Sequence, residues 1–469
     1  MAFRWKLVDP RATGGVVKPG ERLSWPKTIG IGAQHVVAMF GATFVFPLIM
    51  GLDPNLAIMM SGICTIVFLL VVNGKVPSYL GTSASFVGAV VAIRAGGGTS
   101  ASVTGAILVA GAVLALVGVL VHFLGASMLR NILPPVVSGA VVMLIGFNLA
   151  PVVAGVYWPQ DPGVAIITML FTIIAAVAFR GFWSRVAVFL ALIFGYLLSF
   201  VLDKTVGMIT AKTGSGEVTT HFRVDWSGVG KADWFGLPTL HAPDFKVSFI
   251  LLALPGVIAL IAENTGHVRA VAEMTGDNLD PYMGRAIAAD GFGTVLASAV
   301  GGSPTTTYAE NIGVMAATKV YSTAAYYVAA LVAILLGLVP KFGAIISATP
   351  GGVLGGITVV LYGMIGLLGA KIWIENRIDF SNPVNLVPIA AGLIAGIGGV
   401  VMPFGSSFEL SGIALGSIVA IGAYHLARAL APADMKEPLG GGRSYEGGAA
   451  ISTGSVNTDE GKRDPFDQR

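Results

Sequence analysis

The sequence predicts an all-α polytopic membrane protein, and three observations support this. Hydrophobic residues make up 55% of the 469 residues and charged residues only 11%, whereas soluble domains have about 25% charged residues. Apolar stretches recur from about residue 28 to 430, which is the pattern of repeated bilayer spans and not of a single signal peptide. Basic residues also gather in alternate loops, as they do around membrane helices.

Fourteen apolar segments follow one another along the chain, seven on each side of a polar stretch at about 203–247. The first set lies at about 28–50, 54–73, 77–93, 101–124, 134–156, 163–179 and 185–202. The second set lies at about 248–267, 283–302, 305–318, 322–346, 350–370, 384–402 and 411–430. Because the number of spans in each half is odd, the two halves are predicted to be inverted repeats.

The charge of the short loops tests this topology. With both termini in the cytoplasm, the short outer loops carry only Arg94 and Lys341. The short inner loops then carry Lys75, Arg130, Arg180, Arg185, Arg269, Arg285, Lys319, Lys371 and Arg377. This asymmetry is the one expected for cytoplasmic loops, and a count of thirteen or fifteen spans would scramble it.

The third segment of each half is interrupted by small polar residues. Residues 77–88 read PSYLGTSASFVG and residues 303–313 read SPTTTYAENIG. Paired interruptions at matching positions mark the binding site of many transporters. If Thr82, Ser83 and Thr305–Thr307 are extended and each run leads into a half-helix, two helix starts direct free N–H groups at the middle of the membrane. The alternative is that the hydroxyl groups only join neighbouring helices.

Two glutamates, Glu263 and Glu310, fall inside this apolar sequence. A charged side chain at the centre of a membrane helix costs about 3 kcal/mol or more unless it has partners or takes up a proton. We therefore interpret the pair as the holders of a small polar solute, with at least one of them carrying a proton.

Further polar residues accompany the glutamates. His267 follows Glu263 by one helical turn, so it is predicted to bond Glu263 or another acid and to take part in proton movement; the alternative is a histidine without a role near the helix end. Gln34 and His35 are predicted to form a polar network beside the site. Asp290 supports the site from behind or lies at a water-exposed helix end.

The sequence lacks the motifs of several functional classes. The sequence has no nucleotide-binding G-x-x-x-x-G-K-[ST] run, no Cys/His cluster for a metal and no legible Ser-His-Asp set, and its net charge of +3 is too small to indicate nucleic acid binding. We expect a transporter and not an enzyme, without a metal or an organic cofactor. The coupling ion is expected to be the proton.

Four stretches of the chain resemble the nucleobase–ascorbate transporter family, and the likeness covers roughly residues 25–430. They are Gln34–His35, Gly81–Phe86, Ala262–His267 and the run ENIGVMAATK that begins at Glu310. Within the family, the chain looks most like the bacterial uracil permeases, in particular the pyrimidine permeases associated with uracil degradation. The stretches that begin at Met50 (MGLDPNL), Asp280 (DPYMGR) and Thr307 (TYAENIGVMA) carry this closer likeness.

The resemblance implies a domain organisation. It implies short antiparallel strands in the third and tenth segments, a core domain that moves like an elevator, and a homodimer formed through the gate domain in a bacterial inner membrane. The implied parts are the cytoplasmic tail 1–27, the core 28–124 and 248–346, the gate 125–203 and 347–430, the outer loop 204–247, and a disordered cytoplasmic tail 431–469.

The resemblance also implies residue roles. Uracil-type members are proton symporters whose two substrate-binding acids match Glu263 and Glu310 and whose histidine tied to proton coupling matches His267. Backbone amides at Ala84 and Ala309 match those that bind the base, and Tyr308 matches the tyrosine before the second acid. Asn311 follows in the same signature. Relatives can carry an aromatic residue at the position of Ala84, and Phe86 is expected to replace it if the strand keeps both residues on one face.

The predicted function is the proton-coupled import of uracil or a closely related pyrimidine across the cytoplasmic membrane. Uracil has two ring N–H donors, which suit two carboxylates, and two carbonyl oxygens, which suit backbone N–H groups. Two alternatives stay open: a xanthine or urate permease of the same family, and an anion exchanger or channel with a similar fold.

Overall fold

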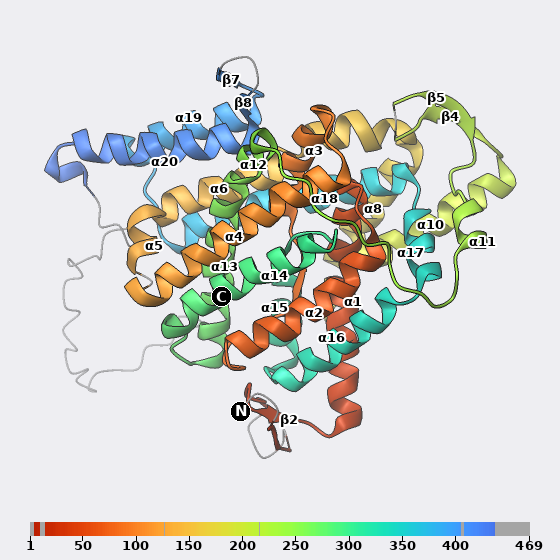
Figure 1. Ribbon diagram of the computed structural model, residues 1–469, viewed down its shortest axis with the longest axis horizontal. Helices are drawn as coiled ribbons and strands as arrows, with labels where there is room; N and C mark the ends of the chain where they lie inside the picture. Colours follow the sequence, from red (N-terminus) through yellow and green to blue (C-terminus); the bar gives the residue numbers. More distant parts are fainter. Residues whose placement is uncertain (1–3, 10–14, 126, 215, 405–407, 437–469) are drawn as a thin grey trace, which may run out of the picture.

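A computed structural model describes residues 4–9, 15–125, 127–214, 216–404 and 408–436, and most of them are helical (Figure 1). Among these residues, eight helices are long and apolar enough to cross a membrane. The number is nine if α16 (Thr323–Gly337) and α17 (Pro340–Ser347), bent by 82° relative to each other, form one span. Most of the tail that the sequence predicts to be disordered, residues 437–469, lies outside the described residues.

The first half of the chain runs from α1 to α10. Its helices and turns are α1 (Trp25–Met50), α2 (Pro54–Val71), η1 (Ala84–Phe86), α3 (Val87–Ala95), α4 (Ser100–Leu124), α5 (Ser127–Ile132), α6 (Pro135–Phe147), α7 (Ala150–Val152), η2 (Val153–Tyr157), η3 (Trp158–Gln160), α8 (Pro162–Ala178), α9 (Phe182–Arg185) and α10 (Ala187–Thr205). Its strands are β1 (Lys6–Leu7), β2 (Glu21–Arg22) and β3 (Leu80–Thr82).

The rest of the chain consists of an outer connection and a second set of helices. Beside α16 and α17, the helices are α11 (Ser227–Lys231), α12 (Val247–Ala253), α13 (Pro255–Thr275), α14 (Asp280–Ala299), α15 (Ala309–Thr318), α18 (Gly351–Glu375), α19 (Pro383–Ile397), α20 (Gly412–Leu430) and η4 (Ala433–Met435). The strands are β4 (Ile209–Lys212), β5 (Val218–His221), β6 (Thr305–Thr307), β7 (Val401–Phe404) and β8 (Phe408–Ser411).

Each of the fourteen predicted segments contains a helix, but not every helix is long enough to cross a bilayer. The two interrupted segments contain only the short helices α3 and α15, each preceded by a strand. The first helix begins at Trp25, three residues before the predicted start, because Pro26 occupies the first turn, where its missing N–H costs nothing.

The two halves of the chain interleave. Helix α4 packs along α14 and α2 along α16, while α18 packs against α6 and α8 and α19 packs against α20. In Figure 1, α2 and α16 lie beside each other. Strand β3 contacts α2 and α1. Most long buried side chains near the strands, including Phe44, Phe68 and Tyr79, belong to one hydrophobic cluster that packs around these helices.

The polar stretch between the halves is more ordered than a plain loop. Strands β4 and β5 form an antiparallel hairpin, and Arg223 then bonds Asp161 (2.7 Å) and Asp203 (3.2 Å) at the ends of α8 and α10. Beyond α11 the chain runs back across the molecule to α12 (Figure 1), with backbone bonds from His241 N to Val300 O and from Asp244 N to Ala101 O. The connection therefore contacts helices of both halves.

The N-terminal segment, predicted as a tail, also packs against the helices. Strand β1 pairs in parallel with β2, and Val17 forms a parallel bridge with Val320, just after α15. The indole N–H of Trp5 donates to the hydroxyl of Thr323 at 2.8 Å. The described part of residues 4–24 is thus fixed to the end of α15 and the start of α16.

Candidate substrate site

The site is built on two short strands that cross inside the helices. Strand β3 pairs with β6 in antiparallel register, with Gly81 opposite Thr306. Two further backbone bonds extend the pair, from Ser83 N to Pro304 O at 2.9 Å and from Tyr308 N to Tyr79 O at 3.1 Å. The strands that the two interrupted segments were expected to form are therefore present, and all of their residues are buried.

Each strand leads directly into a helix. Ser83 links β3 to η1 and its hydroxyl accepts from Ser85 N, whereas the side chain of Tyr308 does not cap α15. Because the first N–H groups of a helix have no partner within it, the starts of η1 and α15 offer donors to a ligand. Both starts, at Ala84 and Ala309, line the same cavity.

This cavity has a volume of about 90 Å³ and collects residues from both halves of the chain. Glu263 and Glu310 both line it, and their side chains are only half-buried because they face its open space. Its lining is completed by Ala42, Phe46, Thr82, Ala84, Ser85, Val142, Ile145, His267, Thr306, Tyr308, Ala309, Leu361, Ile365 and Leu368. The predicted pair of acids thus shares one enclosed space.

The surroundings of Glu263 leave hydrogen-bonding capacity for a ligand. The hydroxyls of Ser85 and Thr306 lie beside its carboxylate and can donate to it, and a carboxylate has acceptor sites left for further donors. Glu263 and Glu310 are also close enough to interact electrostatically. A ligand with N–H donors therefore meets a region rich in acceptors.

His267 does not bond an acid, contrary to the expectation that it would bond Glu263 or another carboxylate. Its Nδ1 atom lies 2.8 Å from the hydroxyl of Thr307 on β6. One helical turn does place it on the side of α13 that carries Glu263, and both residues line the cavity. The hydrogen-bond partner of the imidazole is thus a hydroxyl of strand β6.

Asp290 is buried behind the site, so it does not lie at a water-exposed helix end. Its carboxylate is fully buried and accepts a short hydrogen bond from the Nδ2 of Asn264, the residue after Glu263. Asp290 also lies near Glu263 and near the hydroxyl of Thr306. It does not line the cavity, so its contact with the site passes through Asn264 and Thr306.

His35 holds the start of α15 from the other side. Asn311, the residue after Glu310, donates its Nδ2 to the backbone oxygen of His35 at 3.0 Å and lies 3.1 Å from its Nδ1. Both residues are completely buried. Gln34 is half-buried beside them and does not line the cavity. The predicted polar network therefore runs through His35.

Tyr308 is locked across strand β3. Its hydroxyl donates to Thr82 O at 2.7 Å and lies 3.3 Å from the hydroxyl of Thr43. The ring can lie there because Gly81 has no side chain, since a Cβ at Gly81 would collide with the tyrosine ring and come within 2.6 Å of the Thr43 hydroxyl. Thr82 in turn bonds the hydroxyl of Ser303 at 3.0 Å.

Phe86 does not face the cavity, and the expectation that it replaces an aromatic residue at position 84 is wrong. The strand ends at Thr82, and Ala84–Phe86 is a 3-10 turn. Residues two apart in such a turn point in different directions because each residue advances about 120°. Phe86 is fully buried against Gly256 of α13, where an added Cβ would lie 2.8 Å from its ring.

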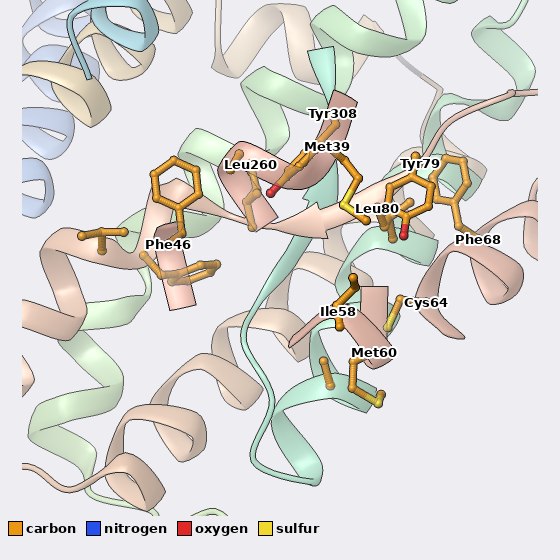
Figure 2. Packing of buried hydrophobic residues seen from close by; sticks show 14 of the residues in the cluster. Met39, Phe46, Ile58, Met60, Cys64, Phe68, Tyr79, Leu80, Leu260 and Tyr308 are labelled. Atoms are coloured by element: carbon orange, nitrogen blue, oxygen red, sulfur yellow. The ribbon is translucent and has the colours of Figure 1, made fainter. Parts of the chain in front are cut away.

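The sequence analysis missed the aromatic side chain that does line the cavity, Phe46 of α1. Figure 2 shows it on one side of the crossing strands, with Phe68 and Cys64 of α2 on the other. A signal was present, since Phe46 lies one helical turn after Ala42 and three turns after His35, on one face of α1. No group of three or more His, Cys, Asp or Glu that could hold a metal ion occurs among the described residues.

Comparison with known proteins identifies the family of the chain. A model of a permease family, that of the xanthine and uracil permeases, matches residues 26–405. The chain belongs to the xanthine/uracil permease family. This permease is a transporter and not an enzyme, and it crosses the membrane several times.

Three relatives of this permease come from bacteria. The permease is 44% identical to "Putative pyrimidine permease RutG" of Escherichia coli (strain K12) over 89% of its own length and 93% of the relative's. It is 36% identical to "Uracil permease" of Escherichia coli (strain K12), over 86% and 91%. With "Uracil permease" of Bacillus caldolyticus it shares 36% identity over 84% and 90%.

Solved structures show the fold of the permease. The transmembrane domain of the cyanobacterial bicarbonate transporter BicA matches with a TM-score of 0.57 at 15% identity, over 89% of the permease and 98% of that chain. The murine anion transporter Slc26a9 in its inward-facing state matches with a TM-score of 0.62 at 11% identity, over 86% and 68%. At such identities the likeness concerns the fold alone.

Proposed function

We propose that this permease is a proton-coupled symporter that imports uracil or a closely related pyrimidine across the cytoplasmic membrane of a bacterium. The observation that carries the proposal is the pair Glu263 and Glu310, which come from different segments and line one cavity with the helix starts at Ala84 and Ala309. The names of the curated relatives, which include pyrimidine and uracil permeases, support the choice of substrate.

The cavity offers a partner for each polar atom of uracil. Its two ring N–H groups would donate to Glu263 and Glu310, because an ionised carboxylate only accepts and a protonated one keeps a carbonyl oxygen that accepts. Its carbonyl oxygens would accept from the backbone N–H groups at the starts of η1 and α15. Such a site rejects analogues that lack an N–H donor, since a buried acceptor would then lose its partner.

Proton coupling follows from the cost of moving charge. Two acids that are alternately empty and filled while the site reorients are expensive to keep ionised in a dry interior. Protonation of one acid removes a charge before the site crosses the membrane. We assign the proton to Glu310 and His267, with Asp290, Asn311, Thr82, Ser83, Gln34 and His35 in supporting positions.

The transport cycle that we propose uses two domains. The core (28–124 and 248–346) would carry the site past the gate (125–203 and 347–430), in fourteen spans arranged as two inverted repeats of seven. Both termini would lie in the cytoplasm, and two copies would associate through the gate. The family match and the interleaved packing of the two halves support this arrangement.

Uptake by reconstituted protein tests the proposal. Proteoliposomes with an inward proton gradient should accumulate labelled uracil, and dissipating the gradient should stop accumulation. Glu310→Gln should bind uracil weakly and lose the response to the gradient, because an amide cannot take up the proton. Gradient-driven accumulation by Glu310→Gln equal to that of the wild type would refute the assignment of the proton to Glu310.

Competition assays separate the alternatives. Excess unlabelled uracil or thymine should reduce uptake more than xanthine or urate, and bicarbonate or chloride should have no effect. Stronger competition by xanthine would favour the purine permease. Saturation-free anion currents would favour the exchanger or channel, which we consider weaker because the site carries two acids and no basic side chain apart from His267 among its lining residues.

A further inference from the structure

We propose that Phe46 is the residue that sets the selectivity of the site for a flat, single-ring base, by forming its apolar wall. This inference rests on the proposed function. Among the residues that line the cavity, only Phe46 and Tyr308 are aromatic, and Tyr308 is committed through its hydroxyl to Thr82 and lies across β3. Of these two aromatic side chains, Phe46 is thus the one that carries no polar group.

The position of Phe46 is fixed along α1. His35, Ala42 and Phe46 share one face of this helix, because they are spaced by seven and four residues. His35 is held against Asn311 at the start of α15, while Ala42 and Phe46 reach the cavity. The face of α1 that His35 holds beside the start of α15 is therefore also the face that carries Phe46.

A proline strengthens this placement. Pro47 follows Phe46 inside α1 and has no N–H, so the carbonyl of Thr43 receives no helical bond from that position. The hydroxyl of Thr82 on β3 is directed at this free carbonyl at 3.4 Å. The helix turn before Phe46 is thereby attached to the strand that leads to Ala84.

A second aromatic residue sets the plane of the Phe46 ring. Tyr362 of α18 lies with its ring centre 6.4 Å from that of Phe46 and with the two planes only 6° apart. Parallel rings at such separations attract each other. Only 3% of Phe46 and 2% of Tyr362 is exposed, so neither ring can rotate freely. The Phe46 ring is therefore held in one orientation where it borders the cavity.

The rest of the lining explains why one ring has this effect. Ala84 contributes only a methyl group to the lining, and the next aromatic residue along the chain, Phe86, is buried against Gly256. The acids and backbone N–H groups recognise the edge of a base, whereas a flat apolar side chain recognises its face. Phe46 is thus the aromatic group available for the face, since stacking of a base on an aromatic ring contributes substantially to binding.

Uracil uptake by Phe46→Leu tests this role. The wild type and the variant are compared at equal amounts of folded protein, judged by gel filtration in detergent. Phe46→Leu should raise the half-saturating uracil concentration about tenfold, as expected for loss of one stacking contact, and should leave the maximal rate nearly unchanged. Phe44→Leu is the matched control, because Phe44 lies on the same helix but packs against Phe40 and Phe342 away from the cavity.

If the maximal rate of uracil uptake also changes, a measurement of substrate selectivity still tests the role of Phe46. Phe46→Ala should enlarge the cavity, so xanthine should compete with uracil more strongly than it does in the wild type, whereas Phe44→Leu should keep the wild-type ranking. An unchanged half-saturating concentration in Phe46→Leu together with an unchanged ranking in Phe46→Ala would overturn the inference. Failure of the wild type itself to take up uracil would instead overturn the proposed function.

Discussion

The imidazole of His267 is joined to the hydroxyl of Thr307, with 2.8 Å between Nδ1 and Oγ1. This bond ties the helix α13, which carries Glu263, to the strand β6 that leads to Glu310. A change at either acid can therefore reach the other along the backbone of β6 as well as through space. His267 also lines the cavity.

His267→Gln should separate binding from coupling. A glutamine can retain a hydrogen bond to Thr307 but cannot exchange a proton, so exchange of uracil across proteoliposomes should persist while accumulation driven by a pH gradient should fall to background. Thr307→Val removes only the hydroxyl that bonds His267. It should reduce gradient-driven accumulation less than His267→Gln does. Full accumulation by His267→Gln would show that the proton travels without this residue.

Glu263→Gln should weaken uracil binding by one to two orders of magnitude. The amide would present its own N–H groups where the carboxylate accepts, and an unsatisfied buried donor costs about 1–3 kcal/mol. Calorimetric titration of the protein in detergent measures the loss. Glu273→Gln, an exposed residue on the same helix, is the control and should bind uracil as the wild type does. Equal affinities of the two variants would remove Glu263 from the site.

Asp290→Leu should lower both stability and uptake. The substitution removes the acceptor of Asn264 Nδ2, which now donates to the fully buried carboxylate of Asp290. A buried donor left without its partner costs about 1–3 kcal/mol, so the thermal unfolding midpoint in detergent should fall clearly. The matched control is Asp277→Leu in the exposed turn after α13. A midpoint equal to that of the control would contradict a supporting role for Asp290.

Gly81→Ala should abolish uptake. The new methyl group would collide with the ring of Tyr308 and with the hydroxyl of Thr43, which forces the two crossing strands apart. Gly422→Ala in α20 tests whether any glycine substitution is harmful, because nothing lies within 4 Å of a Cβ at that position. Normal uptake by Gly81→Ala would mean that the strands tolerate displacement of Tyr308.

Arg223→Lys should loosen the outer connection even though it keeps the positive charge. A guanidinium can bond Asp161 and Asp203 at the same time, whereas an ammonium group lacks the planar fork that matches both. Limited proteolysis should therefore cut residues 204–247 faster in the variant. Lys212→Gln, at an exposed position in β4, should leave the cleavage rate unchanged.

Much of the site was legible in the sequence. Buried acids are costly in a membrane, so Glu263 and Glu310 stood out against apolar surroundings, and the hydroxyl-rich interruptions indicated the strands that now place Ala84 and Ala309 at the cavity. Asn311 and His35 were predicted as supporting polar residues, and they bond each other. These features depend on local composition, which a single sequence displays directly.

Other features depended on the path of the chain in space. The sequence alone determined that this chain enters a membrane, where its polar site lies and which segments are interrupted, because those properties follow from the cost of transferring each side chain out of water. Only the tertiary structure decided that Phe86 turns toward Gly256 and Phe46 toward the cavity, and that His267 bonds Thr307. The physical reason is that a side chain's direction follows from the backbone turn that carries it and from neighbours distant in sequence. The change from strand to 3-10 turn after Thr82 is one such turn, and no periodicity in the residues themselves records it.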